Sequence, residues 1–154
     1  MTSEPGPGVS VLAAHECWGL LRSTEVGRLA VSVNDHPDIF PVNYVVDHGT
    51  IVFRTAEGTK LAAIATRALV AFEADGYDPA VGEAWSVVAK GRAEEIKTHE
   101  ALETTTLPLF PWHSAPKHRF VRIVPEEISG RRFHIVDREV WRTALTDVRP
   151  SASE

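Results

Sequence analysis

The run Val52-Phe53-Arg54-Thr55-Ala56-Glu57-Gly58-Thr59-Lys60-Leu61 joins a strand-like segment to a helix-like one. Apolar and β-branched residues up to Thr55 predict a strand, Gly58 interrupts that pattern, and the apolar run after it predicts a helix. A helix N-terminus presents free backbone N–H groups, so Thr59 and Lys60 occupy a position suited to a phosphate group. A solvated helix start with Thr59 as its N-cap explains the same residues without a ligand. Both interpretations stay open at this point.

Strand signals extend on both sides of this junction. Short runs rich in β-branched and aromatic residues are separated by turn signals such as Asn34–Pro37 and Asp47–Gly49, which predicts a meander of antiparallel strands. The expected strands cover residues 28–33, 39–46, 50–55, 69–75, 84–96 and 120–124, and residues 131–136 are expected to extend the sheet. Short helices are expected over 11–22 (capped by Ser10), 59–67 and 99–106. The sequence therefore predicts a mainly β protein with short helices, in which about six antiparallel strands form a small closed or split β-barrel.

Two residues interrupt the expected strands. Pro41 lies in the middle of the strand over 39–46, where it cannot donate a hydrogen bond to a neighbouring strand. It therefore marks an edge, a bulge or a place where another group meets the backbone. Gly91 is expected to bend the long strand over 84–96.

The composition is that of one globular domain. The chain has 154 residues, of which 44% are hydrophobic and 24% charged. Residues 1–9 are rich in Pro and Gly and are expected to be flexible, residues 10–140 are expected to form the domain, and residues 141–154 a polar tail. The formal net charge of −5 argues against nucleic acid and anionic membrane surfaces as partners.

Three further features bound the function. Cys17 is the single cysteine, which excludes an intrachain disulfide, and no Cys/His spacing indicates a metal site. The N-terminus lacks the basic and apolar regions of a signal peptide, and no stretch is long enough for a transmembrane helix, so a cytoplasmic protein is expected. No spacing of nucleophile and base supports hydrolysis, and catalytic residues stay unassigned.

Five short motifs then follow one another along the chain. They are Gly27-Arg28-Leu29-Ala30, Pro41-Val42-Asn43-Tyr44, residues 53–60, Val70-Ala71-Phe72-Glu73 and residues 85–93. This succession, over residues 10–125, resembles the pyridoxamine 5′-phosphate oxidase-like family of FMN-binding split barrels. It is most similar to the short single-domain branch that includes nitroimidazole-resistance reductases and actinobacterial flavoproteins. The C-terminus departs from the full-length oxidases because it has no Trp-x-Pro-x-Arg pattern, so oxidation of vitamin B6 is not expected.

The resemblance implies a homodimer with two flavins at the subunit interface. It also implies the residues that meet the cofactor: Pro41, Val42 and Asn43 along the ring, Arg54 and Thr55 at its edge and ribityl chain, Thr59 and Lys60 at the phosphate, and Trp85 and Ser86 against the flavin of the partner subunit.

The function implied by this resemblance is flavin-dependent oxidation or reduction of a small organic substrate, in which the flavin carries the redox chemistry. Residues 108–113 are too apolar for an exposed loop, so Trp112 and His113 are expected at the substrate pocket. FMN is the expected cofactor because Thr59 and Lys60 can hold a single phosphate. The deazaflavin F420 and haem stay as alternatives, as does a non-catalytic module that binds flavin or haem.

Overall fold

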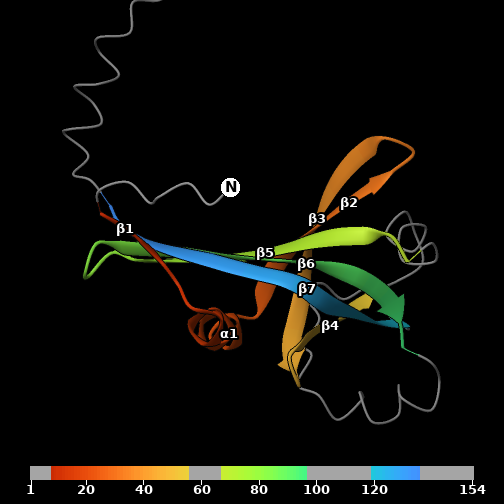
Figure 1. Ribbon diagram of the computed structural model, residues 1–154, viewed down its shortest axis with the longest axis horizontal. Helices are drawn as coiled ribbons and strands as arrows, with labels where there is room; N and C mark the ends of the chain where they lie inside the picture. Colours follow the sequence, from red (N-terminus) through yellow and green to blue (C-terminus); the bar gives the residue numbers. More distant parts are fainter. Residues whose placement is uncertain (1–7, 56–66, 97–118, 136–154) are drawn as a thin grey trace, which may run out of the picture.

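A computed structural model describes residues 8–55, 67–96 and 119–135 (Figure 1). These residues form β1 (Val9–Val11), α1 (Ala14–Arg22), β2 (Val26–Val33), β3 (His36–Asp47), β4 (Thr50–Thr55), β5 (Leu69–Asp78), β6 (Glu83–Glu95) and β7 (Arg119–His134). In this described part of the chain, no helix is long and apolar enough to cross a membrane.

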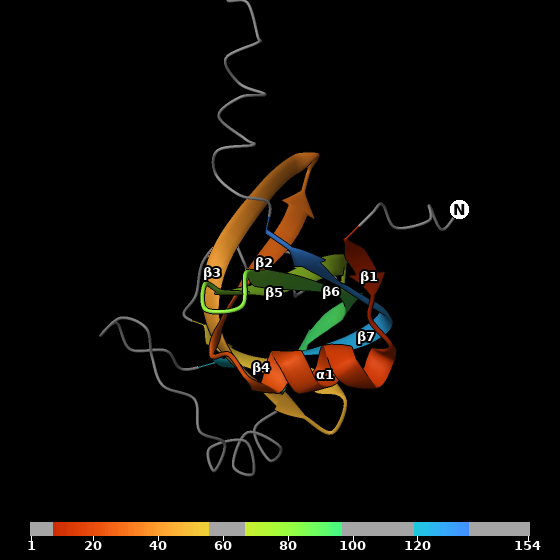
Figure 2. The same ribbon diagram turned by 90° about the vertical axis from the view of Figure 1, so that its left-hand side faces the viewer.

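The strands from β2 to β7 close into a ring. Their order is β7-β4-β3-β2-β5-β6, and a further pairing between β6 and β7 completes the circuit. Every pairing is antiparallel. Figure 2 shows this ring with α1 packed beside it. The predicted six-stranded antiparallel split barrel is therefore confirmed, with the short β1 added to the C-terminal end of β7.

Side chains alternate between the inside of this ring and its outer face, as the pleat of a strand requires. Leu29 of β2, Phe53 of β4 and Phe72 of β5 all point inward and are fully buried. Helix α1 adds Cys17 and Leu21 to the same core, where the thiol of Cys17 is buried. The residues between these inward positions form the outer face, which is where any ligand of the barrel wall must bind.

Strand β3 changes its neighbour halfway along. Residues 36–43 pair with β2, whereas residues 44–47 pair with β4 on the opposite side. The β2–β3 hairpin therefore projects from the ring as an arm (Figures 1 and 2). In the described structure no strand pairs with the second edge of β3 before Tyr44. Pro41 lies on this open edge, which confirms one of the three positions expected for it.

The start of the chain differs from the prediction. The helix begins at Ala14, with Ala13 at its N-cap, and Ser10 belongs to β1. Val11, expected on the apolar face of the helix, lies in that strand and is 61% exposed. The reason is a long-range contact: residues 9–11 pair with residues 131–133, and local periodicity cannot show such a partner.

Two strands are longer than expected. β5 continues to Asp78, and β7 is one strand from Arg119 to His134 that includes both segments predicted separately. The bend expected at Gly91 coincides with a register shift between Lys90 and Gly91, where the extra residue, Glu126, lies on β7. A Cβ at Gly91 would lie 2.0 Å from the carbonyl oxygen of Val124, so the close approach of β7 requires glycine there. The helices predicted over 59–67 and 99–106 lie, apart from Arg67, outside the described residues.

Candidate functional site

Two predicted cofactor residues lie next to the last paired residues of β3 and β4, both on the outer face. The register that pairs Tyr44 with Phe53 places Asn43 opposite Arg54 when it is continued by one residue. On the far side of β4, Arg54 is paired with Phe120 of β7, and its guanidinium carbon lies 5.5 Å from the centroid of that ring. The three strands thus present an amide, a guanidinium and an aromatic ring in one row.

The amide oxygen of Asn43 is the most informative atom of this row. Asn43 Oδ1 is buried, and no group in the described structure donates a hydrogen bond to it. Leaving a buried acceptor unsatisfied costs about 1–3 kcal/mol, so such atoms are uncommon in native proteins. Asn43 Oδ1 can therefore accept a hydrogen bond from a group outside the described residues.

Arg122 of β7 is a second cation of this surface and was not predicted. It is paired with Val52, and its Nη2 donates to Asp47 Oδ2 at 3.0 Å, so its side chain crosses β4. Val52 is fully buried although it faces outward. The Nε atom of Arg122 is buried and, within the described residues, donates no hydrogen bond. The alternation of Phe120 and Arg122 with buried Val121 and Ile123 is the one sequence signal that could have identified it.

Other predicted residues lie on the opposite side of the sheet. Thr55 and Val42 point into the barrel with exposures of 2% and 0%, so only their backbone can reach a ligand on the outer face. Trp85 and Ser86 are adjacent on β6 and therefore point to opposite faces. The indole of Trp85 packs over Gly76, where a Cβ would lie 2.4 Å from Nε1.

Ser86 faces outward, on a different part of the barrel wall from Pro41. The strands β2 and β5 separate the two residues, a distance of three strand spacings or about 14 Å. One flavin ring lying along Pro41 would therefore not be expected to touch Ser86 of the same chain. The remaining predicted residues, Thr59, Lys60, Trp112 and His113, lie outside the described part of the chain.

A charged cluster lies between these two positions and was also not predicted. Arg28 of β2 is paired with Pro41 on one side and with Glu73 of β5 on the other. Its Nη1 lies 3.2 Å from Glu73 Oε2 and 3.1 Å from Asp75 Oδ2. Asp75 is in turn paired with Ser86. Burial, and then the hydrogen bond to Asp75 and its negative charge, raise the pKa of Glu73 to about 7 against the opposing effect of Arg28.

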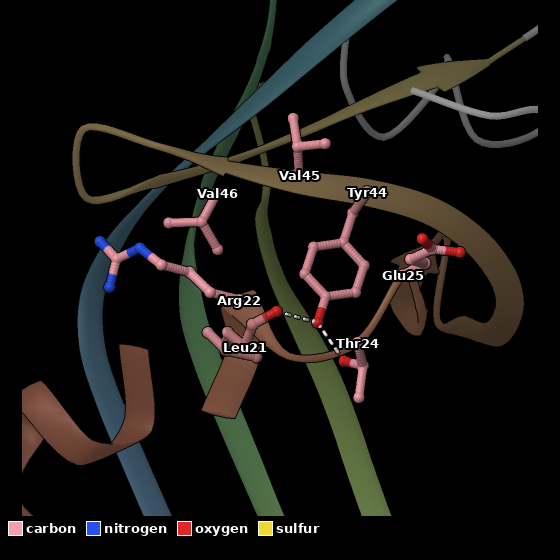
Figure 3. A pocket seen from close by; sticks show the side chains of 7 residues that line it. All are labelled: Leu21, Arg22, Thr24, Glu25, Tyr44, Val45 and Val46. Atoms are coloured by element: carbon pink, nitrogen blue, oxygen red, sulfur yellow. Dashed lines mark hydrogen bonds between the residues drawn. The ribbon is translucent and has the colours of Figure 1, made fainter. Parts of the chain in front are cut away.

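A small pocket of ≈ 260 Å³ opens between the end of α1 and β3 (Figure 3). Arg22 and Glu25 lie at opposite sides of it, around the ring of Tyr44. The Tyr44 hydroxyl donates to the carbonyl oxygen of Leu21 at 2.6 Å and is also hydrogen-bonded to the Thr24 hydroxyl. Burial raises the pKa of Tyr44, so the hydroxyl keeps its proton and holds α1 against β3.

Comparisons with known proteins place this geometry in a family. The family model described as pyridoxamine 5′-phosphate oxidase matches residues 13–132. A protein of Mycobacterium tuberculosis strain H37Rv is 34% identical over 127 residues, which is 79% of this chain and 83% of the relative.

Two solved structures are also similar. A FAD-binding protein from Mycobacterium smegmatis is 41% identical, with a TM-score of 0.69, over 81% of this chain and 98% of its own. A FAD-binding protein from Mesorhizobium loti is 25% identical, with a TM-score of 0.70, over 80% and 97% of the two chains.

Proposed function

This chain belongs to the pyridoxamine 5′-phosphate oxidase family, and on that premise we propose that it binds a flavin and oxidises or reduces a small organic molecule. The similarity to two FAD-binding proteins supports flavin binding, because each matches at least four fifths of this chain. The substrate class and the redox activity are part of the proposal and rest on the family resemblance.

The observation that carries the proposal is the buried Asn43 Oδ1 opposite Arg54. The imide edge of a flavin ring presents one N–H donor between two carbonyl oxygens. A free amide acceptor beside a guanidinium donor is complementary to that edge. The residues present therefore fit a flavin, with Asn43 Oδ1 accepting a hydrogen bond from the imide N–H and Arg54 donating one to a neighbouring carbonyl oxygen.

The residue types indicate which tasks the flavin would perform and which the protein would perform. A bound flavin would supply the hydride and electron chemistry, so no nucleophile is required of the protein. The backbone of Pro41, Val42 and Asn43 would orient the ring, and the charge of Arg54 would favour an electron-rich ring edge. Backbone groups of Thr55 would continue the contact toward the ribityl chain.

Four predicted residues outside the described ranges also have roles in this proposal. Thr59 and Lys60 would hold the phosphate, which favours FMN because a single phosphate suffices. Trp112 and His113 would line the substrate pocket. F420 would require further basic residues for its longer anionic tail, and haem would require an axial ligand.

A homodimer is part of the same proposal. Ile39, Leu69 and Tyr77 lie on the outer face of β3, β5 and β5, with exposures of 63%, 52% and 59%. Leu69 and Tyr77 are eight residues apart on one strand, so these side chains form no single patch and the homodimer rests on the family resemblance. A second copy would also bring Ser86 to the flavin of the partner subunit. Sedimentation velocity at micromolar protein concentration tests the assembly, and a monomer with or without flavin would contradict it.

The first experiment titrates the purified protein with FMN, FAD, F420 and haemin, and follows absorbance and flavin fluorescence. Saturable quenching of FMN or FAD supports the proposal, a preference for F420 retains the fold and changes the hydride carrier, and a Soret band supports haem. Binding without reduction of any substrate would favour a non-catalytic flavin module.

The matched variants are Asn43→Ala and Ser32→Ala. We expect Asn43→Ala to weaken flavin binding about fivefold to thirtyfold, the equivalent of one hydrogen bond of about 1–2 kcal/mol. Ser32 is an exposed polar residue of the neighbouring strand and should give wild-type affinity. Equal affinities for both variants would contradict the assignment of Asn43.

A further inference from the structure

The Arg28–Glu73–Asp75 cluster lies on the wall between two positions assigned to the cofactor. Arg28 is the direct cross-strand neighbour of Pro41, and Asp75 is the direct cross-strand neighbour of Ser86. The side chains are 44%, 30% and 50% exposed, so the cluster is open on one side to whatever covers this wall. Its location ties it to the proposed flavin site, on which this inference rests.

One cation serves two carboxylates in this cluster. Arg28 Nη1 alone reaches both Glu73 and Asp75. With both acids ionised the cluster carries a net negative charge, and with Glu73 neutral it forms a balanced pair of Arg28 and Asp75. A half-buried carboxylate pair with a single cation is an arrangement in which one acid binds a proton near neutral pH.

The surrounding charges are more distant. On β6 the register places Lys90 two residues from Val88, the residue opposite Glu73, and on β7 it places Glu127 and Arg131 beyond β6. The residue directly opposite Glu73 is Val88, and Pro41 on β3 carries no charge. The protonation of Glu73 is therefore governed by Arg28, Asp75 and the remaining access of water.

We propose that Glu73 is the proton-exchanging residue of the flavin wall: it takes up a proton when a flavin covers the Arg28–Glu73–Asp75 cluster, and it releases that proton when the flavin leaves. The physical reason is desolvation. A ring lying along Pro41 removes water from the open side of the cluster and so disfavours the charged form of Glu73. The proton comes from solvent, and no bond other than the carboxyl O–H changes.

The consequence is that flavin binding is linked to pH. Covering the cluster raises the proton affinity of Glu73 in the complex, so FMN binds more tightly at a pH where Glu73 is already neutral. If the bound state shifts the titration by about one unit, the Kd for FMN rises about tenfold from pH 6 to pH 9. Isothermal titration calorimetry with FMN, in two buffers of different ionisation enthalpy near pH 8, counts the protons taken up.

The matched variants are Glu73→Gln and Glu127→Gln, which remove the same charge from the same face. Wild type and Glu127→Gln should take up a measurable fraction of one proton per FMN, and Glu73→Gln none. Glu73→Gln should also bind FMN with a Kd that is nearly constant over this range. Proton uptake that persists in Glu73→Gln would overturn the inference.

A second measurement observes the Glu73 carboxyl directly, first without the cofactor and then with it. In the flavin-free protein, the carboxyl ¹³C resonance of Glu73 should titrate near neutral pH, and the midpoint should rise when FMN is added. An ordinary acidic midpoint would overturn the inference while FMN binding stands. Absence of FMN binding in wild type and both variants would overturn the proposed function, and this inference with it.

Discussion

At the scale of single residues, Tyr44 holds two elements together. Its hydroxyl donates to the last turn of α1 through the carbonyl oxygen of Leu21 and meets the side chain of Thr24. Its ring packs edge-on against Phe72, with centroids 4.7 Å apart. Tyr44, the last residue of the Pro41–Tyr44 motif, therefore has a structural role in packing α1 against the barrel.

We expect Tyr44→Phe to lower the free energy of unfolding by about 1–2 kcal/mol, because the carbonyl oxygen of Leu21 loses a buried donor. Urea denaturation followed by circular dichroism measures this as a lower midpoint with an unchanged m-value. Tyr77→Phe removes the same hydroxyl from a side chain that is 59% exposed and should leave the midpoint unchanged. Equal midpoints for the two variants would argue against a stabilising hydrogen bond from Tyr44 to Leu21.

Glu73 should also be visible in the stability of the flavin-free protein. Its pKa in the fold is raised from an ordinary 4.5 to about 7, so the unfolded chain releases the proton first. The stability that depends on neutral Glu73 is complete below about pH 4.5 and is lost as pH rises through 7. In the wild type this loss of unfolding free energy should be on the order of 1 kcal/mol, because the carboxyl is partly exposed to solvent. In Glu73→Gln it should be absent. Thermal denaturation between pH 5 and 8, at about one-unit steps, is the measurement.

The sequence could name single candidate residues of the site, but it could not predict which residues lie next to one another across the strands. The motifs by themselves name Asn43 and Arg54 as cofactor residues, and that role stays a prediction. Arg122 and the Arg28–Glu73–Asp75 cluster were not predicted, since cross-strand neighbours depend on a register that only the closed sheet defines. Thr55 and Trp85 show the same limit, because their motif fixed a place along the chain and left the direction of the side chain undetermined.

At the scale of elements, the β2–β3 arm has an edge with few donors. The two-residue turn at Asn34 and Asp35 makes Val33 and His36 a hydrogen-bonded pair, so the backbone of alternate residues from Pro37 onward points away from β2. Pro37 and Pro41 have no N–H, and the N–H of Ile39 donates to Asp38 Oδ1 at 2.9 Å. An edge of this kind resists the addition of another strand.

The double variant Pro37→Val with Asp38→Ala should create two free donors on this edge. We expect time-dependent association with a gain of β signal, measured by light scattering and thioflavin fluorescence at raised protein concentration. Asp35→Asn removes one negative charge from the same arm without adding a backbone N–H donor to the edge, so it controls for charge. If the double variant stays as soluble as this control, edge protection is not the role of these residues.

The elements also show why the first motif contains glycine. A Cβ at Gly27 would lie 2.2 Å from the ring of Phe72 and 2.8 Å from the carbonyl oxygen of Glu73. The glycine allows the inward ring of β5 to pack beneath β2, in the strand that carries Arg28. A sequence pattern can mark this glycine, whereas the ring that requires it comes from another motif more than forty residues away.

At the scale of the whole molecule, β7 closes the barrel. It pairs with β6 along most of its length, with β4 at its start and with β1 at its end. Its partners come from the beginning, the middle and the end of the preceding sequence, so the ring cannot close before β7 is present. Most strands and their antiparallel character were predictable from local patterns. β1 was not, because its partner among the described residues is this late strand.

We therefore expect a chain that ends at residue 118 not to fold. It would leave unpaired the edges of β4 and β6 that β7 covers and would expose inward core residues such as Phe53 and Ile51. Amide chemical-shift dispersion in two-dimensional NMR distinguishes the outcomes. A dispersed spectrum from the truncated chain would show that the other strands form a stable sheet alone.

The change of neighbour in β3 has a mechanical meaning. Pairing passes from β2 to β4 between Asn43 and Tyr44, so the arm and the barrel body meet along a seam at that point. A group bound to Asn43 on one side and to Arg54 on the other would span the seam and couple the vibrations of the two parts. The stiffness of the arm, out to its tip at Asn34, would then report whether the seam is bridged.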